Sequence, residues 1–398
     1  MIQLASMDSC TGCSACKAIC PHDAIVMNAD QDGFLFPAIR SDRCRECHWC
    51  EKTCPVLHPH EYAETKLCLA ACSRDDDVRR NSSSGGVFHI LADRILSENG
   101  CVFGCVFDGP EHVIHRKAED RGGLAAMQGS KYLQSDLLDS FRAVKKELEE
   151  GRKVLFSGCP CQIAGLKRFL GAAQANLITM EVICHGVPAL QVWHQYLLWL
   201  KKKMTLSKIR AIEFRNKNSG WQEAHLLISA DGTTTGKNVV PVKVYEHIWR
   251  NPFMMAFLHD LCLRPSCYRC VARGGSSGAD ITVGDFWGIE SVAPDFDDDK
   301  GVSAVIIHSE TGKQILEDCS SKLRIRLVSL QDILRGNRSY LESVFEPPKR
   351  SFFMDKYHDA GNFSELVNRC VRKPLLLRII NRLWLYFRKI FYSSGKEK

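Results

Sequence analysis

Cysteine is the residue type in this sequence whose number and spacing point to chemistry. The chain contains 20 cysteines in 398 residues, and eight of them stand in two runs at positions 10–21 and 44–55. Both runs have the spacing C-x2-C-x2-C-x3-C followed by proline. Two-residue gaps let three thiolates of one tight loop reach one cluster, while the fourth must come from elsewhere. The two runs therefore predict two metal clusters that exchange a ligand.

This spacing is that of bacterial two-cluster ferredoxins, in which the fourth cysteine of each run binds the other cluster. It predicts two [4Fe–4S] clusters, one held by Cys10, Cys13, Cys16 and Cys54 and the other by Cys44, Cys47, Cys50 and Cys20. Zinc is the alternative, but zinc sites usually use four ligands in two C-x2-C pairs. Residues 1–58 are thus predicted to be a ferredoxin domain that relays electrons.

Composition and charge exclude several other classes of protein. Hydrophobic residues make up 45% and charged residues 25% of the chain, which is typical of globular domains. The N-terminus lacks a signal-peptide pattern and we expect no conventional transmembrane helix, so we expect a cytoplasmic protein with reduced cysteines. The net charge is +7, yet residues 349–398 carry twelve basic and four acidic residues and the rest sums to −1. We therefore expect no nucleic-acid partner.

Residues 62–345 have the pattern of an α/β domain. Short apolar segments, often β-branched, predict strands at 66–73, 101–108, 153–157, 177–184, 209–214, 281–284 and 303–308. Amphipathic segments predict helices at 86–98, 137–150, 162–170, 190–203 and 311–322. The predicted fold is a small α+β, ferredoxin-like domain fused to a larger α/β domain with a mixed sheet. Residues 346–398 are predicted to form a basic helical tail.

Four segments place polar or cysteine residues at the ends of predicted elements of this domain. They are Ser82-Ser83-Ser84-Gly85-Gly86 before a helix, Gly158-Cys159-Pro160-Cys161-Gln162 after a strand, Cys184 at a strand end, and the Cys267/Cys270 pair before Gly284-Asp285. Serines and glycines at a helix start expose N–H groups that suit a pyrophosphate, although a simple N-cap and turn would use the same residues. A helix N-terminus near Cys161 would favour its thiolate.

Taken in order, these segments resemble the coenzyme F420 hydrogenase/dehydrogenase beta-subunit family. The resemblance covers residues 62–345 and implies an FAD-containing reductase unit with its own [4Fe–4S] cluster. It implies the ligands Cys161, Cys184, Cys267 and Cys270. One C-x2-C pair with two strand-end cysteines fits such a site, while Cys161 and Cys184 as buried apolar residues are the alternative. Cys159 replaces the threonine of the hydrogenase branch, as a spare ligand, a redox thiol or an inert substitution.

The resemblance also implies which residues bind FAD. These are Ser83, Ser84, Gly85, Gly86, Ser130, Lys131, Tyr132, Gly158, Pro160 and Gln162. Lys131 would suit a phosphate or the reduced flavin anion, with an ordinary surface lysine as the alternative. Lys131 and Asp285 are the candidate catalytic residues, with Asp285 as a polar partner for substrate. No G-x-G-x-x-G follows a strand, so a Rossmann dinucleotide site is not indicated.

These features together predict an iron–sulfur flavoprotein oxidoreductase. FAD would convert between one-electron clusters and a two-electron substrate, either F420 or a small organic molecule. The alternative is a non-catalytic electron-transfer subunit that docks a separate redox partner protein.

The segment 374–391 places basic residues on one side of a helical wheel and large apolar residues on the other. This pattern is typical of a helix that lies in a membrane interface, which would bring the protein to the inner membrane surface. Docking of the same helix on the protein's own core or on a partner subunit is the alternative.

Overall fold

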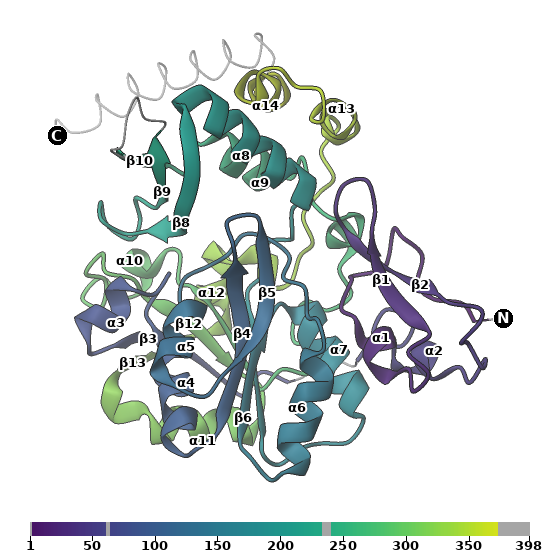
Figure 1. The fold of residues 1–398 in the computed structure, drawn as a ribbon. Helices are drawn as coiled ribbons and strands as arrows, with labels where there is room; N and C mark the ends of the chain where they lie inside the picture. The colour runs from purple at the N-terminus through teal and green to yellow at the C-terminus, as the bar shows by residue number, and fades with distance from the viewer. Residues whose placement is uncertain (1, 61–63, 233–239, 373–398) are drawn as a thin grey trace, which may run out of the picture.

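The computed structural model describes residues 2–60, 64–232 and 240–372. The amphipathic segment predicted at 374–391 lies outside these residues, so its interpretation stays a prediction. Among the helices of the described ranges, none is long and apolar enough to cross a membrane. The residues in these ranges form three sheets, and the N-terminal domain lies against the side of the large sheet (Figure 1).

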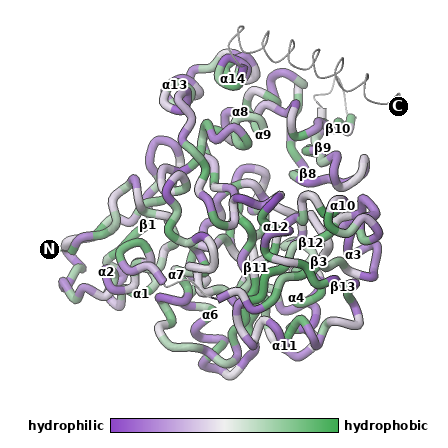
Figure 2. Tube along the Cα trace, turned by 180° about the vertical axis from the view of Figure 1, so that it is seen from behind, coloured by the Kyte–Doolittle hydropathy of each residue, from purple (hydrophilic) through white to green (hydrophobic). Residues whose placement is uncertain are grey.

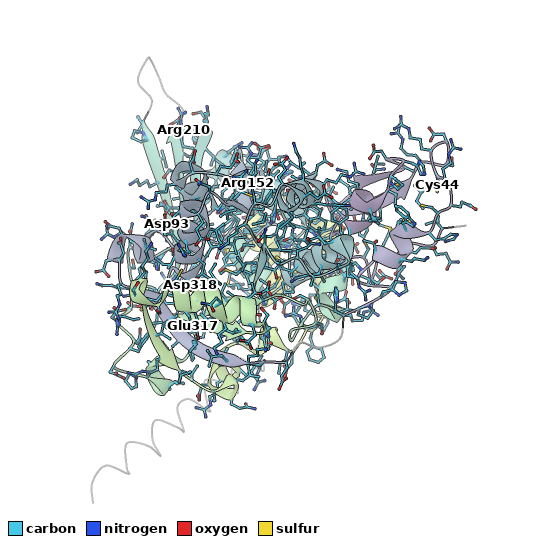
Figure 3. All side chains as sticks on the ribbon, turned by 90° about the horizontal axis from the view of Figure 1, so that it is seen from below. Cys44, Asp93, Arg152, Arg210, Glu317 and Asp318 are labelled. Atoms are coloured by element: carbon cyan, nitrogen blue, oxygen red, sulfur yellow. The ribbon has the colours of Figure 1, made fainter. Side chains whose placement is uncertain are left out.

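The N-terminal domain is a short hairpin with two one-turn helices. Its elements are α1 (Ala15–Ile19), β1 (Ile25–Ala29), β2 (Leu35–Ile39) and α2 (Trp49–Thr53). The two strands pair antiparallel, and the domain's own buried cluster is small, formed by Cys20, Ala24, Ile25 and Cys50. A segment with so few buried apolar side chains needs additional cross-links such as metal clusters. Cys44 lies at the outer end of this domain, away from the large sheet (Figure 3).

The large domain is built on one eight-stranded mixed sheet, which confirms the predicted fold class. The strand order is β13-β3-β12-β11-β7-β6-β4-β5. The strands are β3 (Leu67–Ser73), β4 (Cys101–Asp108), β5 (His112–Ala118), β6 (Val154–Gly158), β7 (Leu177–Val182), β11 (Ile281–Asp285), β12 (Ser303–Ile307) and β13 (Leu323–Leu327). Neighbours among β4, β6, β7 and β11 are parallel, while the outer pairs are antiparallel. The carboxyl ends of the four parallel strands therefore meet at one edge, where α/β proteins commonly bind ligands.

Helices cover both faces of this sheet. They are α3 (Asp76–Arg80), α4 (Val87–Ser97), α5 (Arg121–Met127), α6 (Ser140–Glu149), α7 (Pro160–Leu170), α10 (Ile289–Val292), α11 (Glu310–Asp318) and α12 (Leu330–Gly336). Residues of α4, α5 and α11 share one buried cluster, and residues of α6 and α7 share another on the opposite face. Alternation along β3 sends Leu69 and Ala71 to one face and Cys68, Ala70 and Cys72 to the other. The central strands β3, β11 and β12 accordingly form a hydrophobic layer (Figure 2).

A second layer of the large domain stands beside this sheet. It contains the antiparallel strands β8 (Leu206–Asn216), β9 (His225–Gly232) and β10 (Pro241–His247), with helices α8 (Leu190–Met204) and α9 (Pro252–Leu258). The strand predicted at 209–214 therefore exists but belongs to this three-stranded sheet. Helices α13 (Arg350–Lys356) and α14 (Phe363–Val371) share the buried cluster of α8 and α9. Residues 350–371, predicted as part of a tail, thus contribute to a common core.

Candidate metal centres and cofactor site

The two ferredoxin runs fold in the same way. In each run, the residues on both sides of the second cysteine have positive φ angles: 70° at Gly12 and 60° at Ser14, and 51° at Glu46 and 60° at His48. These left-handed residues turn the loop tightly before a five-residue helix begins. The fourth cysteine then follows each helix in an extended conformation, immediately before the proline. The identical local geometry follows from the repeated spacing.

Each ferredoxin cavity contains the four thiols of one predicted ligand set. Cys10, Cys13, Cys16 and Cys54 line one cavity, together with Thr11 and Gly12. Cys20, Cys44, Cys47 and Cys50 line the other, beside Trp49. The exchange of the fourth cysteine between the runs is thus present in the folded chain. The first set is the more enclosed, whereas Cys47 in the second set is exposed.

The thiols of the first cavity are in an environment that is unfavourable for free thiolates. Burial, with the charges of neighbouring cysteines, raises the pKa of Cys13 to about 12 and raises that of Cys16 still further. Thiolates bind iron, and a bound cation reverses this cost because it compensates the charge of its ligands. Four converging sulfur atoms in a water-poor cavity therefore fit an iron–sulfur cluster.

A third cavity lies at the carboxyl edge of the parallel strands. Five cysteines line it: Cys159, Cys161, Cys184, Cys267 and Cys270. The first two stand where β6 ends and α7 begins, Cys184 follows β7, and the last pair lies at the short helix η1 (Pro265–Arg269). The structure thus brings together the four ligands implied by the family resemblance and adds Cys159. The assignment of a cluster to these thiols remains a proposal.

Cys159 is in direct contact with the implied ligands. Its thiol donates a hydrogen bond to the sulfur of Cys184, which lowers the pKa of Cys184 and raises that of Cys159. Burial raises the pKa of Cys267 to about 12 and also raises that of Cys161. Gln162, an implied flavin residue, instead accepts a hydrogen bond from the Cys159 backbone N–H at 2.9 Å. The side chain of Gln162 therefore fixes the turn that carries Cys159 and Cys161.

The third cavity adjoins the first ferredoxin cavity. Thr11 lines both. A Cβ atom placed on Gly165 of α7 would lie 3.0 Å from the sulfur of Cys13, so the helix approaches the cluster loop closely because it has glycine there. The buried side chain of Arg264 donates hydrogen bonds to Cys10 O at 2.7 Å and Leu35 O at 2.9 Å. The two domains are therefore joined directly between the two sets of cysteines.

The implied phosphate loop at 82–86 is fixed by hydrogen bonds to its neighbours. The Ser83 hydroxyl accepts from Ser130 N–H at 2.6 Å, and the Ser84 hydroxyl donates to Val302 O at 2.8 Å. A Cβ atom on Gly85 would lie 2.4 Å from Ala71 O, and Gly86 has a φ of 86°. Both glycines are thus required by the backbone itself. The contact between Ser83 and Ser130 shows that two of the implied flavin segments lie side by side.

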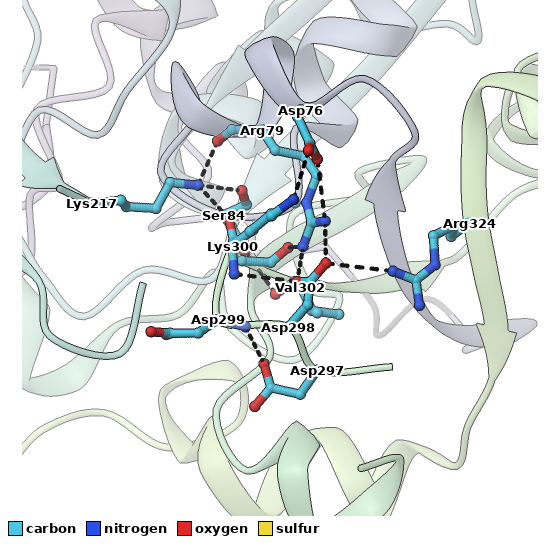
Figure 4. A network of polar contacts seen from close by, with 12 residues as sticks. Asp76, Arg79, Ser84, Lys217, Asp297, Asp298, Asp299, Lys300, Val302 and Arg324 are labelled. Atoms are coloured by element: carbon cyan, nitrogen blue, oxygen red, sulfur yellow. Dashed lines mark hydrogen bonds and ion pairs between the residues drawn. The ribbon is translucent and has the colours of Figure 1, made fainter. Parts of the chain in front are cut away.

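Lysine and arginine side chains hold this loop from outside. Lys217 donates to the carbonyl oxygens of Arg79, Ser84 and Lys300 (Figure 4). Arg79 forms an ion pair with Asp298 and also donates to Gly301 O. Burial lowers the pKa of Lys217 to about 8. This network ties the loop to β8 and to the segment before β12.

The remaining implied cofactor and catalytic residues have protein partners. The Lys131 ammonium donates to Met127 O, Gln128 O and Gly129 O at 2.9–3.1 Å, and burial lowers its pKa. Its three N–H groups are thus used within its own segment. The Tyr132 ring packs on Phe214 and Phe257 with centroid distances of 5.5 and 5.3 Å. Pro160 is buried as the first residue of α7, and Gly158 is the last residue of β6.

Asp285 lies in a polar and aromatic cluster that the sequence did not reveal. Trp221 Nε1 donates to its carboxylate at 2.9 Å, and Arg215 forms an ion pair with it at 3.3 Å. The Arg215 guanidinium lies over Trp287, and Trp287 stacks on Trp221 with a centroid distance of 5.1 Å. Arg215 and Trp221 come from the second layer, whose approach to β11 has no signal in the local sequence.

Comparison with known proteins agrees with this arrangement. Residues 9–57 match the family described as 4Fe-4S dicluster domain, and residues 151–333 match the C terminus of the coenzyme F420 hydrogenase/dehydrogenase beta subunit. The fold and these matches define an iron–sulfur protein in which a dicluster domain precedes an α/β domain. Residues 151–333 thus resemble the coenzyme F420 hydrogenase/dehydrogenase beta-subunit family, in agreement with the motifs of the sequence.

Two known proteins are similar to this chain to different extents. One subunit of the F(420)H(2) dehydrogenase of Methanosarcina mazei is 24% identical and aligns over 85% of this chain and 92% of its own length. A chain in the structure of the F420-reducing [NiFe] hydrogenase complex from Methanosarcina barkeri is 14% identical, with a TM-score of 0.45. That alignment covers 74% of this chain and 93% of the other.

Proposed function

We propose that the protein is an iron–sulfur flavoprotein oxidoreductase that moves electrons through three [4Fe–4S] clusters to or from FAD. The observation that carries this proposal is the succession of three thiol-lined cavities, two of which share Thr11. Electron transfer between clusters requires that they lie close together. The close approach of α7 to Cys13 supplies this proximity.

The exposure of the cavities suggests the order of transfer. Cys47 and Trp49 are exposed beside the second ferredoxin cavity, so a one-electron carrier would approach the chain there. The first ferredoxin cavity follows, and the five-thiol cavity is the most internal. FAD, when bound, would exchange electrons one at a time with the clusters and two at a time with a substrate.

The residues around Ser83 support an FAD site at the start of α4. The helix N-terminus favours an anion through its dipole and its unpaired N–H groups. Ser130 and Gly129 approach the same place from the loop after α5. Asp285, Arg215 and the two stacked tryptophans lie at the carboxyl edge of β11, where a substrate ring would find aromatic and charged partners.

F420 is the first substrate to test, because the name of the Methanosarcina mazei relative includes F(420)H(2). The same name describes a subunit, which favours the second candidate function: an electron-transfer subunit that acts only within a complex. Anaerobically purified full-length protein should contain about twelve iron atoms per chain and FAD. Reduced F420 should then bleach the cluster absorbance. If dithionite bleaches the clusters but reduced F420 does not, F420 is not the substrate of the isolated chain. Absence of flavin would contradict the proposal.

A further inference from the structure

The buried arginines of the described residues divide into two classes. Four arginines have at most 7% of their surface exposed: Arg79, Arg215, Arg264 and Arg273. Arg79 pairs with Asp298 and Arg215 pairs with Asp285. In the described part of the chain, neither Arg264 nor Arg273 forms an ion pair with a carboxylate. A buried charge without a counter-charge costs several kcal/mol, so a missing anion is expected near these two residues.

Arg264 has only neutral partners. It is fully buried, donates to Cys10 O, Leu35 O and the amide oxygen of Gln134, and lies over the rings of two phenylalanines. These partners satisfy its N–H groups without compensating its charge. The side chain lines the third cavity, and through Cys10 O it also contacts the loop of the first ferredoxin cavity.

Arg273 is bound in the same manner on another side of the third cavity. It donates to Cys184 O at 2.8 Å and His185 O at 3.0 Å, and also to Ser339 O. Its Nε is buried and has no hydrogen-bond partner. Glu181 is the carboxyl group that acts electrostatically on Cys270. It accepts a hydrogen bond from Thr282 and pairs with neither arginine.

We infer that Arg264 and Arg273 are the counter-charges of an anionic [4Fe–4S] cluster in the five-thiol cavity and raise its reduction potential. The inference rests on the proposed function, because it needs that cluster. Four thiolates give a [4Fe–4S] centre a net negative charge that grows on reduction, so a nearby cation stabilises the reduced form more than the oxidised form. Net charge and hydrogen bonding around the sulfur atoms are established determinants of cluster potential.

The two arginines should act on different sets of clusters. Arg273 lines the third cavity and bonds to Cys184 O there, whereas Arg264 lies between that cavity and the first ferredoxin cavity. Loss of the Arg273 charge should therefore shift one cluster, and loss of the Arg264 charge should shift two. Both arginines act on the cluster through their charge, since neither supplies a ligand atom.

The test is a redox titration of the full-length, anaerobically purified protein, followed by electron paramagnetic resonance and iron analysis. Arg273→Gln keeps hydrogen-bond donors without the charge, and Arg273→Lys keeps the charge. Arg264→Gln and Arg264→Lys form the second pair. Arg350→Gln is the control, because Arg350 pairs with Glu346 and does not line the cavity. The signal of the third cluster is identified by its absence from a Cys161→Ser variant.

At a fixed potential, Arg273→Gln should lower the ratio of reduced to oxidised third cluster at least tenfold, equal to about 59 mV for a one-electron couple. Arg273→Lys should restore most of it, and Arg264→Gln should also lower the ratio for the first ferredoxin cluster. Unchanged potentials in Arg273→Gln at full iron content, or an equal shift in Arg350→Gln, would overturn the inference. Should Arg264→Gln fail to fold, the Arg273 pair still decides. A wild-type protein with only about eight iron atoms would instead overturn the proposed function, and the inference with it.

Discussion

The ferredoxin cavities and the third cavity hold the same chemical groups but are built in different ways. Every cysteine that lines the first two lies between residues 10 and 54, and the turns of the two runs have matching φ angles. The thiols of the third come from three separate segments between residues 159 and 270. The first two segments meet because β6 and β7 end at one edge of the sheet, and helix η1 brings the third segment to them. The spacing of residues in the sequence is enough to predict a local site. A site built from distant segments depends on the topology of the fold.

The two kinds of site also differ in what surrounds them. The ferredoxin cavities are surrounded mainly by the backbone of their own loops, and few side chains from other segments line them. The third cavity is bordered by a polar layer of the sheet, in which Glu181 pairs in register with Gly158 and Thr282. It also includes two buried arginines and a fifth thiol. We therefore expect its properties to depend on distant residues, and the ferredoxin clusters to depend mainly on their own loops.

The largest expected effect separates the two kinds of site by ligand loss. Cys161→Ser combined with Cys270→Ser removes two thiols of the third cavity, so about four of about twelve iron atoms should be lost. The ferredoxin clusters should remain because none of their ligands changes. Iron and sulfide analysis with resonance spectra measures this. The matched control is Cys262→Ser combined with Cys319→Ser, since both are buried away from the cavities. Full iron content in the cavity variant would contradict the assignment.

The next effect tests the polar layer beneath the third cavity. Glu181 is 1% exposed, and burial raises its pKa to about 7 from 4.5. The folded state therefore holds a proton that the unfolded state loses between about pH 4.5 and 7. Stability should fall as pH rises through this window, and the full cost of about 3 kcal/mol is present above it. Glu181→Gln should raise the thermal midpoint at pH 8 and change it little at pH 4.5.

Glu147 provides a control of opposite sign. Its burial would raise its pKa, but hydrogen bonds and charges of Lys117 and Arg152 lower it. Glu147→Gln should therefore lower the thermal midpoint at pH 8, and this loss should shrink at acidic pH. Unfolding followed anaerobically at both pH values distinguishes the two carboxyls. A Glu181→Gln variant that is destabilised equally at both values would show that its hydrogen bonds, not its charge, dominate.

A smaller effect concerns the joint between the two kinds of site. Gly165→Leu would press on Cys13 and Phe141, whose atoms lie 3.0 and 3.3 Å from an added Cβ. Overpacking of this kind costs about 1–3 kcal/mol, and it should displace Cys13 and reduce the occupancy of the first ferredoxin cluster. Gly122→Leu is the control because that helical glycine of α5 is exposed. Equal iron content and unfolding midpoints in both variants would argue against the joint.

The sequence predicts the central strands well and the edge strands poorly. Predictions at 66–73, 101–108 and 303–308 agree with β3, β4 and β12 to within one residue. The strands β5 and β13 are absent from the prediction, and both lie at the edges of the large sheet, where arginine or lysine residues interrupt the apolar sequence. Central strands are buried on both faces and have continuous apolar sequences. Edge strands lack this signal, so their polar sequences resemble those of connections.

The residues that line the cavities also divide into those that the sequence predicts and those that it does not. The eight ferredoxin cysteines follow from spacing alone, and the structure groups them as predicted. Thr11, Arg264 and Arg273 have no such signal, because their roles depend on contacts between segments that are distant in sequence. Lys131 is the reverse case. The family resemblance implied that it binds a cofactor, but the sequence could not show that its ammonium group donates to three nearby carbonyl oxygens.

The smallest expected effect tests whether an anion lies at the Ser83 loop. Gly129 has a φ of 78°, and a Cβ atom there would meet nothing within 4 Å, so the position faces open space beside the Ser83–Ser130 contact. Asparagine and aspartate both tolerate positive φ and have nearly the same shape. Gly129→Asp places a negative charge where the pyrophosphate of FAD is proposed, and repulsion of about 1 kcal/mol at such a site would weaken flavin binding roughly fivefold. Gly129→Asn should retain the flavin. Fluorescence of FAD released from each purified variant, with iron content as the internal standard, measures the difference. Equal flavin content in the two variants would place the pyrophosphate elsewhere, and the start of α4 would then be a helix cap without a ligand.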